Sequence, residues 1–210
     1  GLRQAAVLFG LTLAFSLPLG LLVALGSMSR CRPVRAVFDA LVWVIRGTPL
    51  VLQLIIIFYG PGLWLGRNIW GSHRMLACIV AFVLNYACYF SVIYRGGIEG
   101  VPAGQREAAL SQGFSDHALF RYVLLPQGLA NAWQPVVGQY LNLMKLSSLA
   151  SGIGFAELTY QVRQIESYNA HALEAFAVGT VLYLVFGVVL GLLLGRLGPG
   201  QCRTQARRAK

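Results

Sequence analysis

The stretch from Ala175 to Gly195, AFAVGTVLYLVFGVVLGLLLG, contains no charged side chain. A helix of about 20 apolar residues crosses the hydrocarbon of a bilayer. Membrane-barrel strands alternate apolar and polar residues, and Leu182–Leu194 does not alternate, so this stretch predicts a transmembrane helix. Uncharged stretches of similar length occur at Ala5–Ser27, Gly47–Gly66 and Met75–Tyr94, and Tyr122–Ala156 is interrupted by a single charge, Lys145.

The composition of the whole chain is that of a membrane protein. Of its 210 residues, 57% are hydrophobic and 11% are charged, and the mean hydropathy is +0.64, whereas a soluble domain carries charge on roughly a quarter of its residues. We therefore predict an all-α integral membrane protein with about five transmembrane helices. The predicted spans cover about 5–27, 43–66, 75–95, 130–153 and 174–196 of one domain, residues 1–210. Because the sequence begins with Gly1 rather than Met, we expect the natural N-terminus to lie upstream.

The formal charge of +10 suggests a nucleic-acid partner at first, but the positions of the basic residues argue against one. With the N-terminus outside and the spans alternating sides, twelve Lys and Arg residues fall in inner segments and four in outer segments. This positive-inside distribution places the C-terminus in the cytoplasm. Attraction to anionic lipid of the inner leaflet explains the basic tail, which contains Arg203, Arg207, Arg208 and Lys210.

The sequence predicts no cofactor, since its cysteines do not form a metal site and it has no nucleotide-binding motif. The cysteines lack metal-ligand spacing and lie in inner segments or the third span, so we expect free thiols at Cys31, Cys78, Cys88 and Cys202. The sequence also lacks the G-x-x-x-x-G-K-[ST] loop that cradles nucleotide phosphates. We expect no catalytic residue, no metal and no cofactor in this chain.

The segment 96–126, between the third and fourth spans, is polar enough to leave the membrane. Ala103–Gln112 predicts a short helix that ends at Gly113 in the left-handed conformation. Ser115 is a suitable N-cap, and Asp116 follows in the first turn, where the helix dipole favours an anion. The pattern predicts a cytoplasmic helix-turn-helix, which could either brace the bundle or dock a partner.

A spaced set of residues in this segment favours docking. The set comprises Glu107, Ala108, Ala109, Gly113, Leu125 and Pro126. It resembles the EAA loop of permease subunits of ATP-binding-cassette (ABC) importers, the cytoplasmic element that docks into the ATPase subunit. The agreement in residue type and spacing extends over twenty positions between two hydrophobic spans.

Further motifs resemble those of the polar amino-acid importers, the histidine/glutamine/arginine-type permeases. Arg46–Leu50 with Gln53 and Leu54 resembles RGTPL..QL, Arg95–Ile98 resembles RGGI, Gly104–Ala109 resembles GQ.EAA, Leu125–Gln127 resembles LPQ, Lys145–Leu149 resembles K.TSL, and Glu157–Thr159 resembles ELT. The resemblance implies a multi-pass permease of the bacterial cytoplasmic (inner) membrane. Its implied partners are a second permease subunit, identical or similar, an ABC ATPase subunit that holds ATP and Mg²⁺, and an extracytoplasmic amino-acid-binding protein.

One position departs from the family pattern. Many members carry a Glu three residues before the Arg of RGGI, and this chain has Val92 there. Any substrate contact made by that carboxylate is absent. The departure indicates either the weaker-binding half of a heteromeric pair or a substrate of different charge.

Four polar residues within the spans are candidates for the substrate pathway. Lys145 is embedded in an apolar stretch, and such a residue faces a bundle interior, a cavity or a partner, or extends its ammonium to the interface. In a cavity, its charge would suit an α-carboxylate, with Ser147 and Ser148 as hydroxyl donors. Asn85, in the middle of the third span, either hydrogen-bonds across helices or lines a cavity, and packing is the favoured reading.

Two other classes of protein agree less well with the sequence. A free-standing secondary transporter or channel usually shows internal repeats and broken helices that meet at the midplane, and the sequence has no convincing repeat. An intramembrane enzyme needs paired acid, base or metal-ligand residues at membrane depth, and none is evident. Transport by a permease subunit remains the leading prediction.

Overall fold

The computed structural model describes residues 1–67, 69–169 and 171–197, and these form helices and connections without a strand. This confirms the all-α prediction for the described residues. The basic tail and Cys202 lie outside them. The α-helices are α1 (Leu2–Ser27), α2 (Arg32–Gly47), α3 (Leu50–Leu65), α4 (Arg74–Glu99), α5 (Ala103–Ser111), α6 (Asp116–Leu119), α7 (Leu125–Leu146), α8 (Leu158–Asn169) and α9 (Ala172–Leu197). A π-helical turn, Phe120–Leu124, precedes α7, and a 3₁₀ segment, Ser147–Ile153, follows it.

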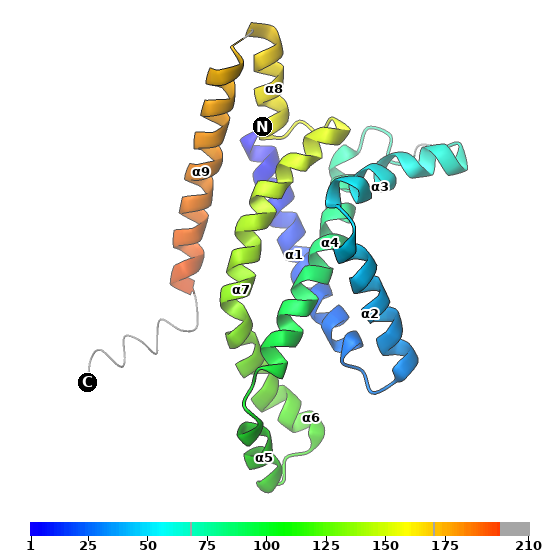
Figure 1. Cartoon of the computed structure of the whole chain (residues 1–210), viewed down its shortest axis with the longest axis vertical. Helices are drawn as coiled ribbons and strands as arrows, with labels where there is room; N and C mark the ends of the chain where they lie inside the picture. The colour runs from blue at the N-terminus through cyan, green and yellow to red at the C-terminus, as the bar shows by residue number, and fades with distance from the viewer. Residues whose placement is uncertain (68, 170, 198–210) are drawn as a thin grey trace, which may run out of the picture.

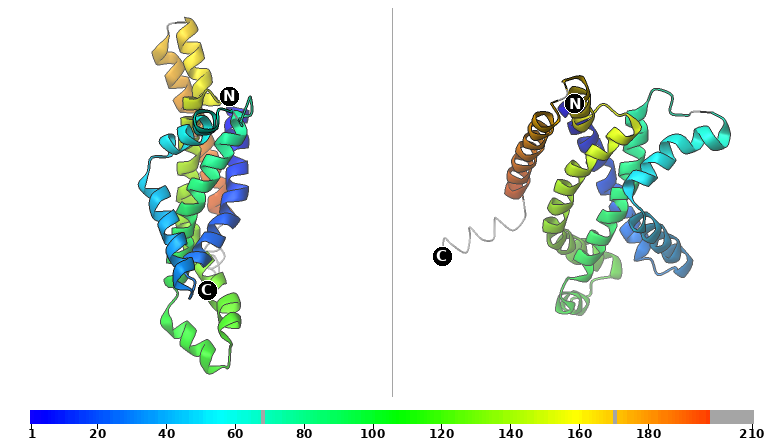
Figure 2. Two further views of the ribbon diagram at one scale, coloured as in Figure 1. Left: turned by 90° about the vertical axis from the view of Figure 1, so that its right-hand side faces the viewer. Right: turned by 45° about the horizontal axis from the view of Figure 1, so that its top comes forward.

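The long helices α1, α4 and α7 run side by side along the long axis of the molecule (Figure 1). Helix α4 is the centre of the bundle because it packs against α1, α2, α3 and α7. Its side chains Phe82, Tyr86 and Phe90 are fully buried. Shorter helices extend this bundle at both ends: α5 and α6 lie at one end, and α8 lies at the other (Figure 2).

Glycines allow α4 and α7 to approach closely near the α5–α6 end. A Cβ atom on Gly97 would collide with the carbonyl oxygen of Gly128, and a Cβ on Gly128 would lie 2.8 Å from the Cα of Ile98. The Asn131 amide donates to the Gly97 carbonyl at 3.2 Å across the same contact. Backbones in membrane helices approach this closely where small residues face each other.

Helix α9 packs on α7 and α8 along one side of the bundle. Only 6% of the most apolar 18-residue stretch of α9 is buried, so most of its Leu and Val side chains are exposed on the outside of the bundle. The fully buried Glu157 fixes its upper half: the carboxylate accepts from the Thr159 and Tyr160 amides, each at 2.8 Å, and from the Tyr183 hydroxyl of α9 at 2.8 Å. One carboxylate therefore caps α8 and ties it to α9.

Three described helices are long and apolar enough to cross a membrane: α1, α4 and Ala172–Arg196 of α9. A fourth candidate arises if α2 and α3 are taken together. Helix α7 carries several amides and a lysine, which lower its hydropathy, so a span there stays a prediction.

The predicted second span, 43–66, is not a single helix. Helices α2 and α3 meet at Thr48–Pro49 with a bend of 103°. Proline disfavours the α conformation in the residue before it, and Thr48 is extended at φ −117° and ψ 145°. The fourth predicted span also differs in its bounds, because α7 begins at Leu125 and continues after Leu146 as a 3₁₀ segment.

The glycine contact between α4 and α7 predicts a sharp difference between neighbouring positions. Gly97→Ala should destabilise the protein by about 1–3 kcal/mol, because overpacking forces the two backbones apart. Gly96→Ala is the control, since a Cβ there meets nothing within 4 Å. Thermal unfolding in mild detergent should show a lower melting temperature for Gly97→Ala alone. Equal melting temperatures would contradict a tight contact.

Candidate functional site

The segment between α4 and α7 folds as the predicted helix-turn-helix. Gly113 has φ 81°, the left-handed conformation that glycine adopts without steric cost. Its amide donates to the Leu110 carbonyl at 3.0 Å, and the Phe114 amide donates to the Ala109 carbonyl at 3.1 Å. These two bonds form a Schellman motif that ends α5.

The second helix of the segment begins as its sequence predicts. The Ser115 hydroxyl accepts from the Ala118 amide at 3.3 Å, so it is the N-cap of α6. Asp116 in the first turn forms a 2.6 Å ion pair with Arg30, in the connection between α1 and α2. Both side chains are well exposed, so the pair adds little stability. Its effect is to join the helix-turn-helix to the start of α2.

The motif residues divide between the inside and the outside of this element. Ala109 is buried, whereas Glu107 and Ala108 are exposed, and Leu110 and Tyr122 leave apolar surface open at 44% and 67% exposure. Leu125 is half-buried and Pro126 exposed at the start of α7. Exposed apolar side chains beside a charged one, outside the bundle, suit contact with another protein.

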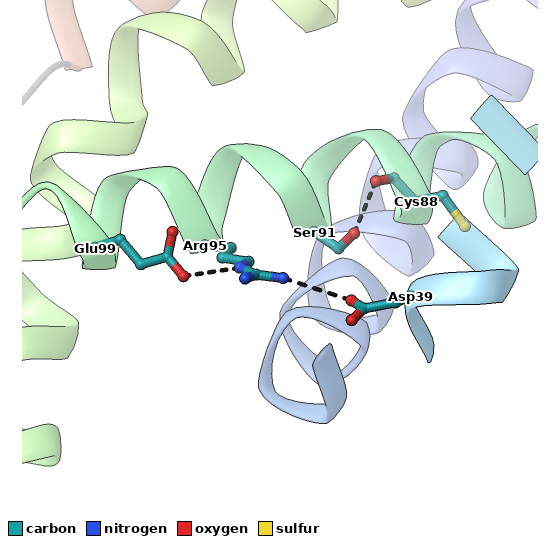
Figure 3. Close-up of polar contacts among 5 residues, drawn as sticks. All are labelled: Asp39, Cys88, Ser91, Arg95 and Glu99. Carbon is teal, nitrogen blue, oxygen red and sulfur yellow. Dashed lines mark hydrogen bonds and ion pairs between the residues drawn. The ribbon is translucent and has the colours of Figure 1, made fainter. Parts of the chain in front are cut away.

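Polar contacts hold the root of the helix-turn-helix to the bundle (Figure 3). The Arg95 guanidinium donates to Glu99 at 2.8 Å within α4 and reaches Asp39 of α2 at 3.4 Å. One turn away, the Ser91 hydroxyl donates to the Cys88 carbonyl at 2.7 Å. Arg95 thus connects the last turns of α4 to α2.

A pocket of about 360 Å³ lies where the α2–α3 break faces α4 and α7. The break itself, from Gly47 to Val51, forms one wall. Polar and charged side chains from three helices form much of the remainder: Arg46, Asn85, Tyr86, Tyr89, Gln139 and Asn142. Asn85 is near the middle of the 26-residue helix α4, so the pocket lies about halfway along the bundle, and Arg46, Thr48 and Pro49 in its lining are exposed.

Hydrogen bonds of the Gln53 side chain stabilise the α2–α3 break. Its amide nitrogen donates to the Ile45 carbonyl and to the Thr48 hydroxyl, each at 2.7 Å, and its amide oxygen accepts from Asn85 at 3.0 Å. The Thr48 hydroxyl donates in turn to the Val44 carbonyl at 2.9 Å. Side chains thereby supply partners for carbonyls that the end of α2 leaves without helical ones.

The structure separates the predicted pathway residues. Asn85 lines the pocket, whereas Lys145 is exposed in a different groove, of about 560 Å³, between α7 and α9. Ser147 is buried and donates to the Met144 carbonyl at 2.7 Å, and Ser148 donates to the Lys145 carbonyl at 2.8 Å. Both hydroxyls therefore bond carbonyls in the last turn of α7, and Lys145 does not join Asn85.

Val92, the position of the departure from the family pattern, is 38% exposed on α4 and is not part of the pocket lining.

Several pocket residues are not identifiable as site residues from the sequence alone. Gln139 and Asn142 are three residues apart, a spacing that places two amides on one helix face and could have indicated a polar surface on α7. In the sequence, Arg46 is recognisable only as part of a motif. Its position at the pocket depends on the bend after Gly47, which hydropathy does not reveal.

The family described as "Binding-protein-dependent transport system inner membrane component" matches residues 16–201. The chain belongs to this family. The match covers most of the chain, including the helix-turn-helix and the pocket, and confirms the resemblance carried by the sequence motifs.

Relatives of this permease include proteins of several amino-acid transport systems. It is 36% identical over 201 residues to the nopaline transport system permease protein NocM of Agrobacterium fabrum. That alignment covers 90% of this chain and 83% of the relative. It is 33% identical over 172 residues to the arginine transport system permease protein ArtQ of Bacillus subtilis, with 82% and 77% covered. The glutamine transport system permease protein GlnP of Escherichia coli is 36% identical over 154 residues, with 73% and 69% covered.

Solved structures share the fold. The crystal structure of an amino acid ABC transporter with histidines matches with a TM-score of 0.87 and 33% identity, over 94% of this chain and 91% of that one. The MetNI methionine ABC transporter in an inward-facing conformation matches with a TM-score of 0.72 over the same shares of the chains. At 18% identity, this second match shows the fold alone.

The contacts of Gln53 predict that it stabilises the helix break. Gln53→Ala should lower the free energy of unfolding by about 1–3 kcal/mol. The reason is that the Ile45 carbonyl, the Thr48 hydroxyl and the Asn85 amide each lose a hydrogen bond. Gln134→Ala, at an exposed position of α7, is the control and should have no effect beyond about 0.5 kcal/mol. Thermal unfolding of the detergent-solubilised variants measures the difference. A Gln53→Ala protein that melts with the wild type would show that the break needs no such support.

Proposed function

We propose that this chain is the membrane permease subunit of an ATP-driven amino-acid importer, and that it couples to its ATPase subunit through the helix-turn-helix of segment 96–126. The observation that carries the proposal is this element itself, which projects from one end of the bundle with Glu107 and Ala108 exposed. The family match over residues 16–201 supports a transport role. The relatives of the permease support amino acids as the substrate class.

The proposed topology has five spans, formed by α1, the α2–α3 pair, α4, α7 and α9. The N-terminus is outside, and the C-terminus and the helix-turn-helix are in the cytoplasm of a bacterial cell, with the protein in its inner membrane. The ion pair between Arg30 and Asp116 supports this orientation, because it joins the basic α1–α2 connection to the helix-turn-helix. Basic connections favour the cytoplasmic side.

The proposed partners follow from what this chain leaves open. Helix α2 has no buried residue, and its Val37 and Trp43 are 68% and 78% exposed, which suits packing against a second permease subunit, identical or similar. ATP and Mg²⁺ belong to the ATPase subunit, and an extracytoplasmic amino-acid-binding protein delivers the substrate. This chain supplies the pathway and no catalytic residue.

The proposed coupling is mechanical. The ATPase subunit moves the helix-turn-helix, whose two ends continue into α4 and α7. The Asp116–Arg30 and Arg95–Asp39 contacts extend this movement to α2. Packed helices that move as a body open and close a pathway by rocking.

Co-purification and ATP hydrolysis test the coupling. The wild-type permease, extracted in mild detergent from its native host, should retain an ABC ATPase subunit, identified by mass spectrometry, and should support ATP hydrolysis. Gly113→Asp and Glu107→Arg should each reduce the retained ATPase about tenfold or more, since they alter the turn and the exposed face. Glu174→Lys changes a carboxylate to a cation at the other end of the molecule and should have no such effect.

If no ATPase subunit accompanies the wild type, the importer assignment is wrong. Uptake driven by an ion gradient in vesicles would then identify a free-standing secondary transporter.

A further inference from the structure

The groove of about 560 Å³ between α7 and α9 is lined mainly by apolar side chains. Leu141 and Met144 of α7 line it, and so do Leu184, Val188 and Leu192 of α9. These three side chains of α9 are more than half exposed, so the groove opens on the outside of the bundle. Its volume is within the range of small-molecule sites, about 300–1,000 Å³. An apolar groove on the outside of a membrane bundle suits a hydrocarbon ligand better than a water-soluble one.

Two glycines of α9, Gly187 and Gly191, give the groove its depth. A Cβ on Gly187 would lie 3.5 Å from the Met144 sulfur, and a Cβ on Gly191 would lie 3.9 Å from a methyl carbon of Leu141. Both are ordinary contact distances, unlike the collision at Gly97. The helices therefore do not close on each other at these glycines, and space is left beside α9.

Lys145 supplies a positive charge to the lining of the groove. Its side chain is exposed, and it forms no ion pair with any carboxylate in the part of the chain that the structure describes. No Asp or Glu is among the described residues that line the groove. Glu157, which Tyr183 contacts from the groove, already accepts from that hydroxyl and from two backbone amides. The Lys145 ammonium is therefore available to an anionic group of a ligand.

The position of Lys145 along the bundle matches that of a lipid headgroup. Lys145 is in the last turn of α7, and the Tyr183 hydroxyl lies 3.1 Å from the hydroxyl of Thr159, in the first turn of α8. Helix α8 extends beyond this end of the bundle (Figure 1). From Tyr183 to Leu192 the groove follows α9 for about 14 Å, which is about half of the 30 Å thickness of bilayer hydrocarbon. The groove thus has the length of one leaflet, with the cation at its outer end.

We propose that the groove between α7 and α9 binds one anionic phospholipid, with an acyl chain along Gly187 and Gly191 and the phosphate at Lys145. The assignment to the extracytoplasmic leaflet rests on the proposed topology of the importer, whereas the site itself does not depend on transport. A zwitterionic headgroup would bring a second cation close to Lys145, and like charges repel each other. The bound lipid fills the space between the two helices and so stabilises α9 against α7.

Native mass spectrometry of the permease complex, purified with its partner subunits in mild detergent, tests the selectivity. The complex is titrated with phosphatidylglycerol and with phosphatidylcholine of the same acyl chains. Phosphatidylglycerol should be retained at about tenfold lower concentration, the difference expected for hydrogen bonds between charged groups. Equal retention of the two lipids would overturn the proposal. A wild-type complex without an ATPase subunit would refute the proposed function, and the titration of the permease would still decide the lipid site.

Lys145→Gln tests the headgroup contact in the same titration. This variant should lose the preference for phosphatidylglycerol. Arg163→Gln is the control, because Arg163 is an exposed cation of α8 outside the groove lining, and it should keep the preference. A preference that persists in Lys145→Gln would exclude Lys145 as the phosphate contact and overturn the proposal.

Gly187→Leu tests the acyl-chain contact, because the added side chain occupies the groove. Retention of both lipids should fall about tenfold or more. Gly195→Leu is the control on the same helix: a Cβ there meets nothing within 4 Å, and Gly195 does not line the groove. Unchanged lipid retention in Gly187→Leu would overturn the proposal. Loss of a second permease subunit from the Gly187→Leu complex would also overturn it, since protein rather than lipid would then fill the groove.

Discussion

Every backbone amide and carbonyl within hydrocarbon must have a hydrogen-bond partner, and the architecture of this permease follows from that requirement. Continuous helices meet it in α1, α4 and α9. The α2–α3 pair departs from it at Thr48–Pro49, where the chain bends by 103°. Gln53 replaces some of the lost helical bonds by donating to the Ile45 carbonyl while it accepts from Asn85. The amides at the start of α3 are left over, and these face the pocket.

Features with local causes could be predicted from the sequence. The helix-turn-helix is specified by Gly113 and Ser115, whose effects act within a few residues of each position. The apolar stretches at α1, α4 and α9 are likewise recognisable from length and composition. Pro49 is a local signal for the bend after Gly47. The mean hydropathy of the whole span does not reveal it, because the residues that follow Pro49 are mostly apolar.

Features that depend on how helices face one another could not be predicted in the same way. Lys145 and Asn85 are both polar residues in apolar surroundings, yet they lie in different cavities. The rotation of α7 about its axis turns Lys145 toward α9 and away from Asn85 on α4. Arg46 reaches the pocket because α2 ends beside the middle of α4. Helix register and rotation are set by packing contacts spread over the whole bundle, such as the one between Gly97 and Gly128.

That glycine contact has a geometric consequence for transport. Gly97 and Asn85 are twelve residues apart on α4, which corresponds to about 18 Å along the helix axis. A rotation of about 10° about the contact would shift Asn85 by about 3 Å relative to α7, roughly the length of a hydrogen bond. The contact then acts as a fulcrum with a short arm toward the helix-turn-helix and a longer one toward the pocket. A small displacement at the end that carries the helix-turn-helix would be enough to change which polar side chains face one another across the pocket.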